Sequence, residues 1–267
     1  MNVLISNDDG VLAPGLAALR WAAGDLGSVS VVAPATAQSA AGHGITLRDP
    51  LMVRRLELDG LDGERFEALS VNGRPADCVR LALRKLMSDT HRRPDLVLSG
   101  INAGSNVGIN IFYSGTVAAA AEGAMLNLPA VAFSLELVPA KPPDWRRCGR
   151  YCRWVLDRLL ARGLSGGDLI NVNLPALGPN EEPAGVCVVP QSTAGIDDEY
   201  LLHPTEDGTE QYRLGDYFRF QTSNEDTDVA RILKGWITIT PLHFDMTHRT
   251  RLVSLIDPQW DPLPPIE

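Results

Sequence analysis

Residues 2–33 read NVLISNDDGVLAPGLAALRWAAGDLGSVSVVA, and this stretch decides the fold. Residues 2–6 form an apolar run of strand length, and residues 14–27 have the apolar spacing of a helix that ends at a glycine. A second apolar run follows at residues 28–33. A strand, a helix and another strand in immediate succession predict the start of a parallel, wound sheet with helices on both faces.

The same alternation continues over most of the chain. Further strands are expected at residues 51–58, 65–71, 95–100, 130–134 and 168–175, and helices near residues 75–87, 117–126 and 143–162. We therefore predict a Rossmann-like α/β fold with a mostly parallel sheet, whose catalytic core spans residues 1–187.

Beyond residue 188 the pattern changes to polar and acidic stretches, with short strands expected at residues 217–222 and 235–242. We interpret residues 188–267 as a C-terminal extension within the same structural unit. It is predicted to form a β-hairpin arm and a returning strand. Such an arm is typical of subunit contacts or of a cover over a site.

Composition excludes several classes of partner. The 267 residues carry a formal net charge of −9, which disfavours nucleic acid polymers and anionic membranes as ligands. The most apolar long segment, residues 117–135, is interrupted by Glu122, Asn127 and Pro129, so no membrane span is expected. Residues 1–10 lack the features of a secretory signal. We expect a cytoplasmic protein.

Asp8 and Asp9 stand side by side where the first strand ends. Two adjacent carboxylates repel each other unless they are solvated or share a cation, and carboxylate oxygens are the ligands that hard divalent cations prefer. The alternative is that one of them caps a helix or forms a turn, as Asp commonly does. The pair by itself leaves both interpretations open.

A second polar segment, residues 99–116, reads SGINAGSNVGINIFYSGT and leads into an alanine-rich helix. Its glycines permit unusual backbone conformations, and the helix that begins near Ser114, Gly115 and Thr116 offers backbone N–H groups to an anion such as phosphate. The stretch matches neither the dinucleotide fingerprint nor the P-loop. A loop of turn residues without a ligand is the alternative.

The loop after the second strand, residues 34–50, carries Ser39 and His43. Ser39 either bonds locally or completes a metal shell, and His43 either binds phosphate or is a loop histidine with a local partner. The carboxyl ends of parallel strands meet at one edge of a wound sheet. We therefore expect the loops after the strands at 2–6, 28–33 and 95–100 to line one crevice.

Together these motifs resemble the SurE family, the stationary-phase survival proteins, which are metal-dependent nucleotidases. The resemblance runs over nearly the whole chain and rests on six main motifs: NDDG at 7–10, APG at 13–15, QSAAGHGITL at 38–47, PADCV at 75–79, SGINAGSNVG at 99–108 and YSGTVAAAAEG at 113–123. The chain departs from the family pattern at Arg74, where threonine is usual, and at Ala35, where aspartate is frequent. Because Arg74 departs from the family pattern, the substrate preference of the family does not carry over directly to this chain.

The resemblance implies hydrolysis of nucleoside 5′- and 3′-monophosphates, with short-chain polyphosphate as a further substrate in some members. It also implies one Mg²⁺ or Mn²⁺ per subunit on Asp8, Asp9, Ser39 and Asn102, and a homodimer or homotetramer. One of the two aspartates would take the proton from the attacking water, while Asn106 and residues 114–116 hold the phosphate.

Two alternatives remain open from the residues alone. One is a phosphatase with an aspartyl-phosphate intermediate on Asp8, although the usual Asp-x-Asp pattern of that class is absent. The other is a non-catalytic protein that binds or senses nucleotides in the same crevice.

Overall fold

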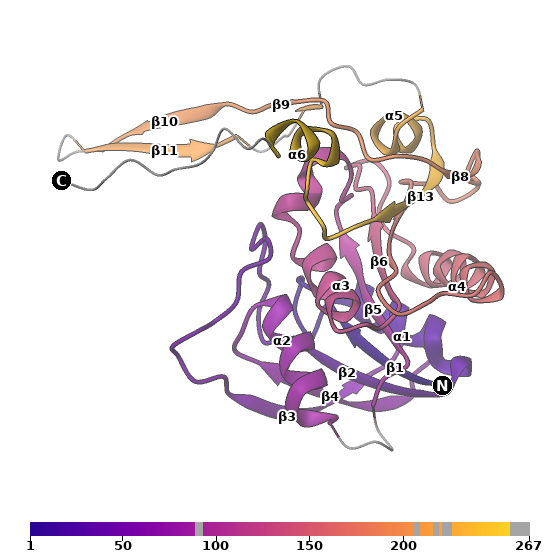
Figure 1. The fold of residues 1–267 in the computed structure, drawn as a ribbon. Helices are drawn as coiled ribbons and strands as arrows, with labels where there is room; N and C mark the ends of the chain where they lie inside the picture. Colours follow the sequence, from indigo (N-terminus) through magenta and orange to yellow (C-terminus); the bar gives the residue numbers. More distant parts are fainter. Residues whose placement is uncertain (89–92, 206–208, 216–218, 221–225, 257–267) are drawn as a thin grey trace, which may run out of the picture.

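The computed structural model of the protein describes residues 1–88, 93–205, 209–215, 219–220 and 226–256 (Figure 1). Its centre is a nine-stranded sheet with the order β3-β4-β2-β1-β5-β6-β7-β13-β8. The strands are β1 (Asn2–Ser6), β2 (Ser28–Pro34), β3 (Val53–Asp59), β4 (Arg65–Val71), β5 (Leu96–Ala103), β6 (Ala130–Leu135), β7 (Leu169–Leu174), β8 (Gly185–Val188) and β13 (Trp236–Leu242). Neighbouring strands run parallel except for the pairs β3–β4 and β7–β13. The predicted fold class is confirmed.

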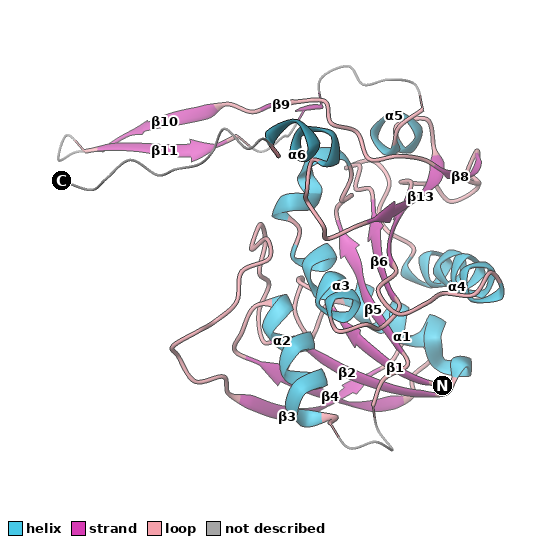
Figure 2. Cartoon of the chain, viewed as in Figure 1, coloured by secondary structure: helices cyan, strands magenta, loops and turns pink. Residues whose placement is uncertain are grey.

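Helices cover both faces of this sheet (Figure 2). The packed helices are α1 (Pro14–Ala23) and α4 (Trp145–Ala161) on one face, and α2 (Pro75–Leu81) and α3 (Gly115–Met125) on the other. On β1, Val3 and Ile5 belong to the core beneath α1 and α4, whereas Leu4 belongs to the core beneath α2 and α3. Both faces of β1 are therefore buried, which is why its sequence is a continuous apolar run rather than an alternating one.

The helix boundaries follow from local chemistry. Pro14 occupies the first turn of α1, where its missing N–H costs nothing. The carboxylate of Asp144 accepts a hydrogen bond from the backbone N–H of Arg147 and so begins α4. Cys148 and Cys152 lie one turn apart on the buried face of α4, as their spacing predicts. Both α1 and α2 end earlier than expected and pass into other helical turns, η1 (Gly24–Leu26) and η2 (Ala82–Leu86).

The chain after β8 leaves the sheet and then returns to it. Its elements are β9 (Ile196–Asp197), β10 (Tyr200–Pro204), β11 (Glu210–Leu214), β12 (Arg219–Phe220), α5 (Asp228–Ile232), β13 and α6 (Arg249–Leu255). β13 inserts between β7 and β8, so the strand expected at 235–242 belongs to the main sheet. Of the strand expected at 217–222, β12 covers residues 219 and 220, and the other residues lie outside the described ones.

The antiparallel pair β10–β11 projects far from the body of the molecule and is called the arm below (Figure 1). The sequence predicts a hairpin in this region but does not place its strands at residues 200–204 and 210–214. Within the described part of the chain, no helix is both long enough and apolar enough to cross a bilayer.

Candidate active site

A cavity of about 510 Å³ lies where the loops after β1, β2 and β5 meet. These three strands are neighbours in the sheet, in the order β2-β1-β5. The predicted residues Asp8, Asp9, Ser39, Asn102, Asn106 and Ser114 all line this cavity. The loops that the sequence expects at one crevice are thus brought together by the parallel order of their strands.

Asp8 is the most deeply placed carboxylate of the site. It is 7% exposed, its Oδ1 accepts a hydrogen bond from the hydroxyl of Thr116, and α3 begins directly against it. A Cβ atom added at Gly115 would come within 2.7 Å of the Asp8 Cβ, so this close approach requires glycine. Burial raises the pKa of Asp8 to about 6, the neighbouring Asp9 charge adds to that rise, and the Thr116 bond opposes it.

Asp9 joins the first loop to the third. Its Oδ2 accepts a hydrogen bond of 2.8 Å from the backbone N–H of Ala103, one residue after Asn102. The carbonyl of Asp8 accepts a bond of 2.8 Å from the N–H of Gln38, which is adjacent to Ser39. The aspartate pair therefore connects all three loops, and it positions Ser39 and Asn102 through their chain neighbours.

The donor set suits a hard divalent cation. Asn102 donates its Nδ2 to the carbonyl of Gly104 at 2.7 Å, which leaves its Oδ1 as an available ligand. Two carboxylates, one hydroxyl and one amide oxygen form an all-oxygen set of the kind that Mg²⁺ and Mn²⁺ take. A cation beside Asp8 would favour its charged form, which burial disfavours. Among the described residues no cluster of three or more His, Cys, Asp or Glu side chains is placed to hold a metal.

Asn106 is fixed from two neighbouring strands. Its N–H donates to Asn173 Oδ1 at 2.8 Å, and its carbonyl accepts from the Nδ2 atoms of Asn171 and Asn173. Its own Nδ2 donates to the hydroxyl of Ser134 at 2.8 Å. Asn171 and Asn173 of β7 thus supply hydrogen-bond partners for the N–H and carbonyl of Asn106, which has no strand partner in this loop.

The next turn of the same loop is fixed by the C-terminal extension. Asp228 is completely buried, and its two oxygens accept hydrogen bonds from the N–H groups of Gly108, Ser192 and Val229, each at 2.8 Å. Gln191 Nε2 donates to the carbonyl of Gly108 at 2.9 Å. Sequence reasoning did not assign a role to Asp228. Its position directly after Thr227 was the only available signal, because a Thr-Asp pair in a polar stretch is typical of a helix start.

The three residues at the predicted helix start have different roles. Ser114 is the N-cap of α3 and accepts a bond from Val117 N–H at 3.0 Å, and it also faces the cavity. Thr116 is fully buried and points to Asp8, and neither Thr116 nor Gly115 lines the cavity. Gly115 and Thr116 therefore act on the shape of the site through Asp8.

His43 does not line the cavity, because its Nε2 lies 3.0 Å from Glu122 Oε1 on α3. Arg80 Nη1 donates to the other Glu122 oxygen at 3.2 Å. Burial by itself would raise the pKa of Glu122, but the hydrogen bonds and charges of His43 and Arg80 lower it overall. A second anchor of this loop is Asp77, which accepts bonds from the N–H and the hydroxyl of Thr46.

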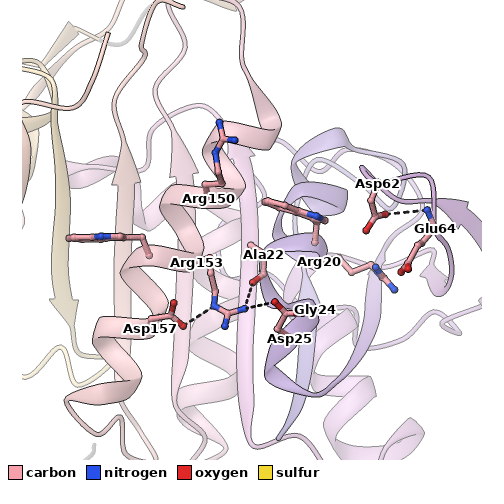
Figure 3. A pocket seen from close by; sticks show the side chains of 11 residues that line it. Arg20, Ala22, Gly24, Asp25, Asp62, Glu64, Arg150, Arg153 and Asp157 are labelled. Atoms are coloured by element: carbon pink, nitrogen blue, oxygen red, sulfur yellow. Dashed lines mark hydrogen bonds and ion pairs between the residues drawn. The ribbon is translucent and has the colours of Figure 1, made fainter. Parts of the chain in front are cut away.

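A second cavity of about 520 Å³ lies between α1, α4 and the β3–β4 turn (Figure 3). Arg153 crosses it and pairs with Asp157 at 2.7 Å and Asp25 at 3.7 Å. None of the predicted site residues lines it. Exposed ion pairs of this kind are common on helix surfaces and carry no chemistry by themselves.

The fold and the first cavity define an α/β protein of the class that binds its ligand at the carboxyl ends of parallel strands. The family model described as "Survival protein SurE" matches residues 3–197. The "5'-nucleotidase SurE" of Maridesulfovibrio salexigens is 39% identical over 256 residues, which cover 96% of this chain and 98% of that protein. The "5'-nucleotidase SurE 1" of Thermus thermophilus is 40% identical, and 96% of each chain is covered.

The crystal structure of the SurE protein from Aquifex aeolicus is similar to this structure, with a TM-score of 0.79 and 34% sequence identity. The likeness covers 96% of this chain and 98% of that one. This chain belongs to the SurE family.

Proposed function

We propose that this chain is a 5′-nucleotidase, a phosphoric monoester hydrolase that acts on nucleoside 5′- and 3′-monophosphates with one Mg²⁺ or Mn²⁺ per subunit. The observation that carries the proposal is that Asp8, Asp9, Ser39 and Asn102 line one cavity. Relatives that match nearly the whole chain are named 5′-nucleotidases, which supports the same function.

Asp8, Asp9, Ser39 and Asn102 are the residues that would hold the cation. When bound, the cation supplies polarisation of a phosphoryl oxygen and neutralises negative charge. The protein contributes the placement of these ligands, which the bonds from Thr116 and Ala103 hold in position before substrate arrives. One of the two aspartates accepts the proton of the attacking water.

The phosphate would lie between this ligand set and the start of α3. Ser114 faces the cavity at the helix N-terminus, where backbone N–H groups and the helix dipole favour an anion. Asn106, also at the cavity wall, is held firmly enough by β6 and β7 to keep the adjoining backbone fixed. Placement of this kind contributes more to phosphoryl transfer than any single nucleophile.

The test is phosphate release from a panel of 5′- and 3′-nucleotides with Mg²⁺, Mn²⁺ or a chelator. Activity is expected only with metal, and Asp8→Asn should reduce kcat by about 100-fold or more. Circular dichroism of the variant shows whether the fold is kept. Turnover that is insensitive to both the chelator and Asp8→Asn would contradict the metal site.

Two variants of the proposal are separated by further measurements. Incorporation of ¹⁸O from labelled water into an aspartate side chain would establish a covalent intermediate on Asp8 in place of direct attack by water. Nucleotide binding without phosphate release at every metal concentration would establish a binding or sensing protein.

The remaining expectations are part of the same proposal. Short-chain polyphosphate is a further candidate substrate. The absence of a spanning helix among the described residues supports a cytoplasmic location. The projecting arm, with Leu201, Leu202 and Tyr212 exposed, supports a homodimer or homotetramer in which it contacts another subunit.

A further inference from the structure

Part of the wall of the cavity comes from the C-terminal extension. Ile196, Asp198, Tyr200 and Leu214 line the same cavity as the aspartate pair. Tyr200 and Leu214 are paired across the first rung of the β10–β11 hairpin, so they mark the base of the arm. A single cavity of about 510 Å³ is of the size that holds a small-molecule ligand, and it joins a polar end to a partly aromatic one.

The two ends differ in the chemistry that they offer. Two aromatic rings line the cavity, Tyr113 next to Ser114 and Tyr200 at the base of the arm, and more than half of each is exposed. Asn110 also lines the cavity, and its Oδ1 is buried without a hydrogen-bond partner among the described residues. Aromatic rings and an unpartnered amide suit a ribose or a base, whereas they offer no charge to a phosphate.

The charged residues that line the cavity also differ between its two ends. Among the described residues that line the cavity, none is a lysine, an arginine or a histidine. The ionised side chain at the arm end is Asp198, an exposed carboxylate with no ion-pair partner in the described part of the chain. A phosphate bound at the Asp8 end has the cation to balance it, but a second phosphate of the same substrate would lie near Asp198 with no balancing charge.

We propose that the base of the arm determines substrate specificity: Tyr113 and Tyr200 contact the nucleoside, and Asp198 discriminates against substrates that carry more than one phosphate. This inference rests on the proposed function, because it assigns the second end of the same site. It places nucleoside monophosphates above nucleoside diphosphates and tripolyphosphate as substrates of this chain.

The size of the effect follows from the width of the cavity. Two charges on the order of 10 Å apart in a partly hydrated cavity interact strongly enough to change an equilibrium by about 3- to 10-fold. Because Asp198 is exposed, the discrimination should weaken as salt is raised.

The decisive experiment compares Asp198→Asn with the matched control Glu199→Gln. Glu199 is the next residue, is also exposed and does not line the cavity, so its replacement removes the same charge from the same segment. Asp198→Asn should raise kcat/KM for ADP and tripolyphosphate by about 3- to 10-fold and leave AMP within about twofold. Glu199→Gln should change none of the three. Equal effects of the two variants, or no effect of Asp198→Asn, would overturn the inference.

A second pair of variants tests the contact with the nucleoside. Tyr200→Ala should raise KM for AMP by about 5- to 10-fold, the usual size of a lost aromatic contact with a base, and leave KM for tripolyphosphate unchanged. Phe244→Ala is the control, since Phe244 is an exposed aromatic residue outside both the arm and the cavity lining. A parallel rise for both substrates in Tyr200→Ala would contradict a nucleoside contact.

Failure of the proposed function gives a different result from failure of this inference. If the wild-type protein releases no phosphate from AMP with either metal, the nucleotidase proposal fails. The inference is then decided by calorimetric binding of AMP and ADP in the presence of Mg²⁺, where the ratio of their Kd values must change in Asp198→Asn and remain unchanged in Glu199→Gln.

Discussion

The loop at residues 99–116 and the arm line the same cavity but are held in opposite ways. The loop is bonded to β6, β7 and the C-terminal extension through buried partners of Asn106 and Gly108. Every described residue of β10, by contrast, is exposed, and the arm projects away from the sheet (Figure 1). The side of the cavity with the proposed metal ligands is therefore fixed by buried hydrogen bonds, whereas the base of the arm has no comparable support.

This difference has an energetic reason. A buried N–H or carbonyl that loses its partner costs about 1–3 kcal/mol, so each bond to the loop resists opening. An exposed hairpin has no comparable penalty, because water replaces any bond that opens. Four changes test how far the contrast holds.

The largest effect is expected at the contact between α3 and Asp8. In Gly115→Ala the added methyl group meets Asp8 and the side chain of Pro75, so Asp8 must move. Displacement of a catalytic group by about 1 Å costs on the order of 100-fold, and kcat for AMP should fall by about that factor.

Gly24→Ala is the matched control for this change. Gly24 has a helical φ of −55°, and no atom lies within 4 Å of a Cβ placed there. Its kcat should equal that of the wild type. An active Gly115→Ala protein with its fold intact would show that the close approach is not needed.

Asp228→Ala should lower the free energy of unfolding by about 2 kcal/mol, because the buried N–H groups of Gly108 and Ser192 lose their acceptor. Urea denaturation measures the change. Asp226→Ala is the control, since among the described residues Asp226 forms only an exposed ion pair with Arg231, whose loss should cost about 0.5 kcal/mol. Equal losses in the two variants would contradict the role of Asp228 as an anchor.

Glu122→Gln should lower the free energy of unfolding by about 1 kcal/mol at pH 7, because an uncharged amide replaces the carboxylate that faces His43 and Arg80. The pKa of Glu122 is lower in the folded protein than its ordinary value of 4.5. Its ionisation therefore stabilises the fold above that value, and the contribution is lost as the pH falls through the folded pKa.

The wild type and Glu122→Gln should consequently approach each other in stability as the pH falls below 4.5 and through the lowered pKa of Glu122. Chemical denaturation at pH 7, 5 and 3.5 follows this convergence. A difference between the two proteins that stays constant over the three pH values would mean that the charge of Glu122 is not what stabilises the loop.

The smallest effect on a single chain is expected in the arm. Leu202→Ser and Tyr212→Ser replace exposed apolar side chains, so the free energy of unfolding per chain should change by no more than about 0.5 kcal/mol. Light scattering coupled to size exclusion should nevertheless show a smaller assembly, if the arm contacts another subunit as proposed. An unchanged mass would place the subunit contact elsewhere.

The amino-acid pattern is enough to predict the wound sheet and the position of its polar loops. The continuous apolar runs of β1 and β6 can only be buried on both faces, and short runs of that kind alternating with helices lead to parallel order. The motifs at 7–10, 38–47 and 99–108 then identified the family and its expected ligands. These features depend on residues that are close together in the sequence, so short sequence patterns are enough to predict them.

Which polar residues face the cavity, and which support it from behind, depends on how distant elements pack together. The side chains of His43 and Thr116 are of types that can bind a ligand. The packing of α3 against the sheet instead directs them to Glu122 and Asp8. Asp228 lies 120 residues beyond Gly108, and Asp198 lies 84 residues beyond Ser114 in the same cavity lining, so no local pattern records these contacts. A side chain's direction depends on the packing of distant elements, and that packing exists only once the chain has folded.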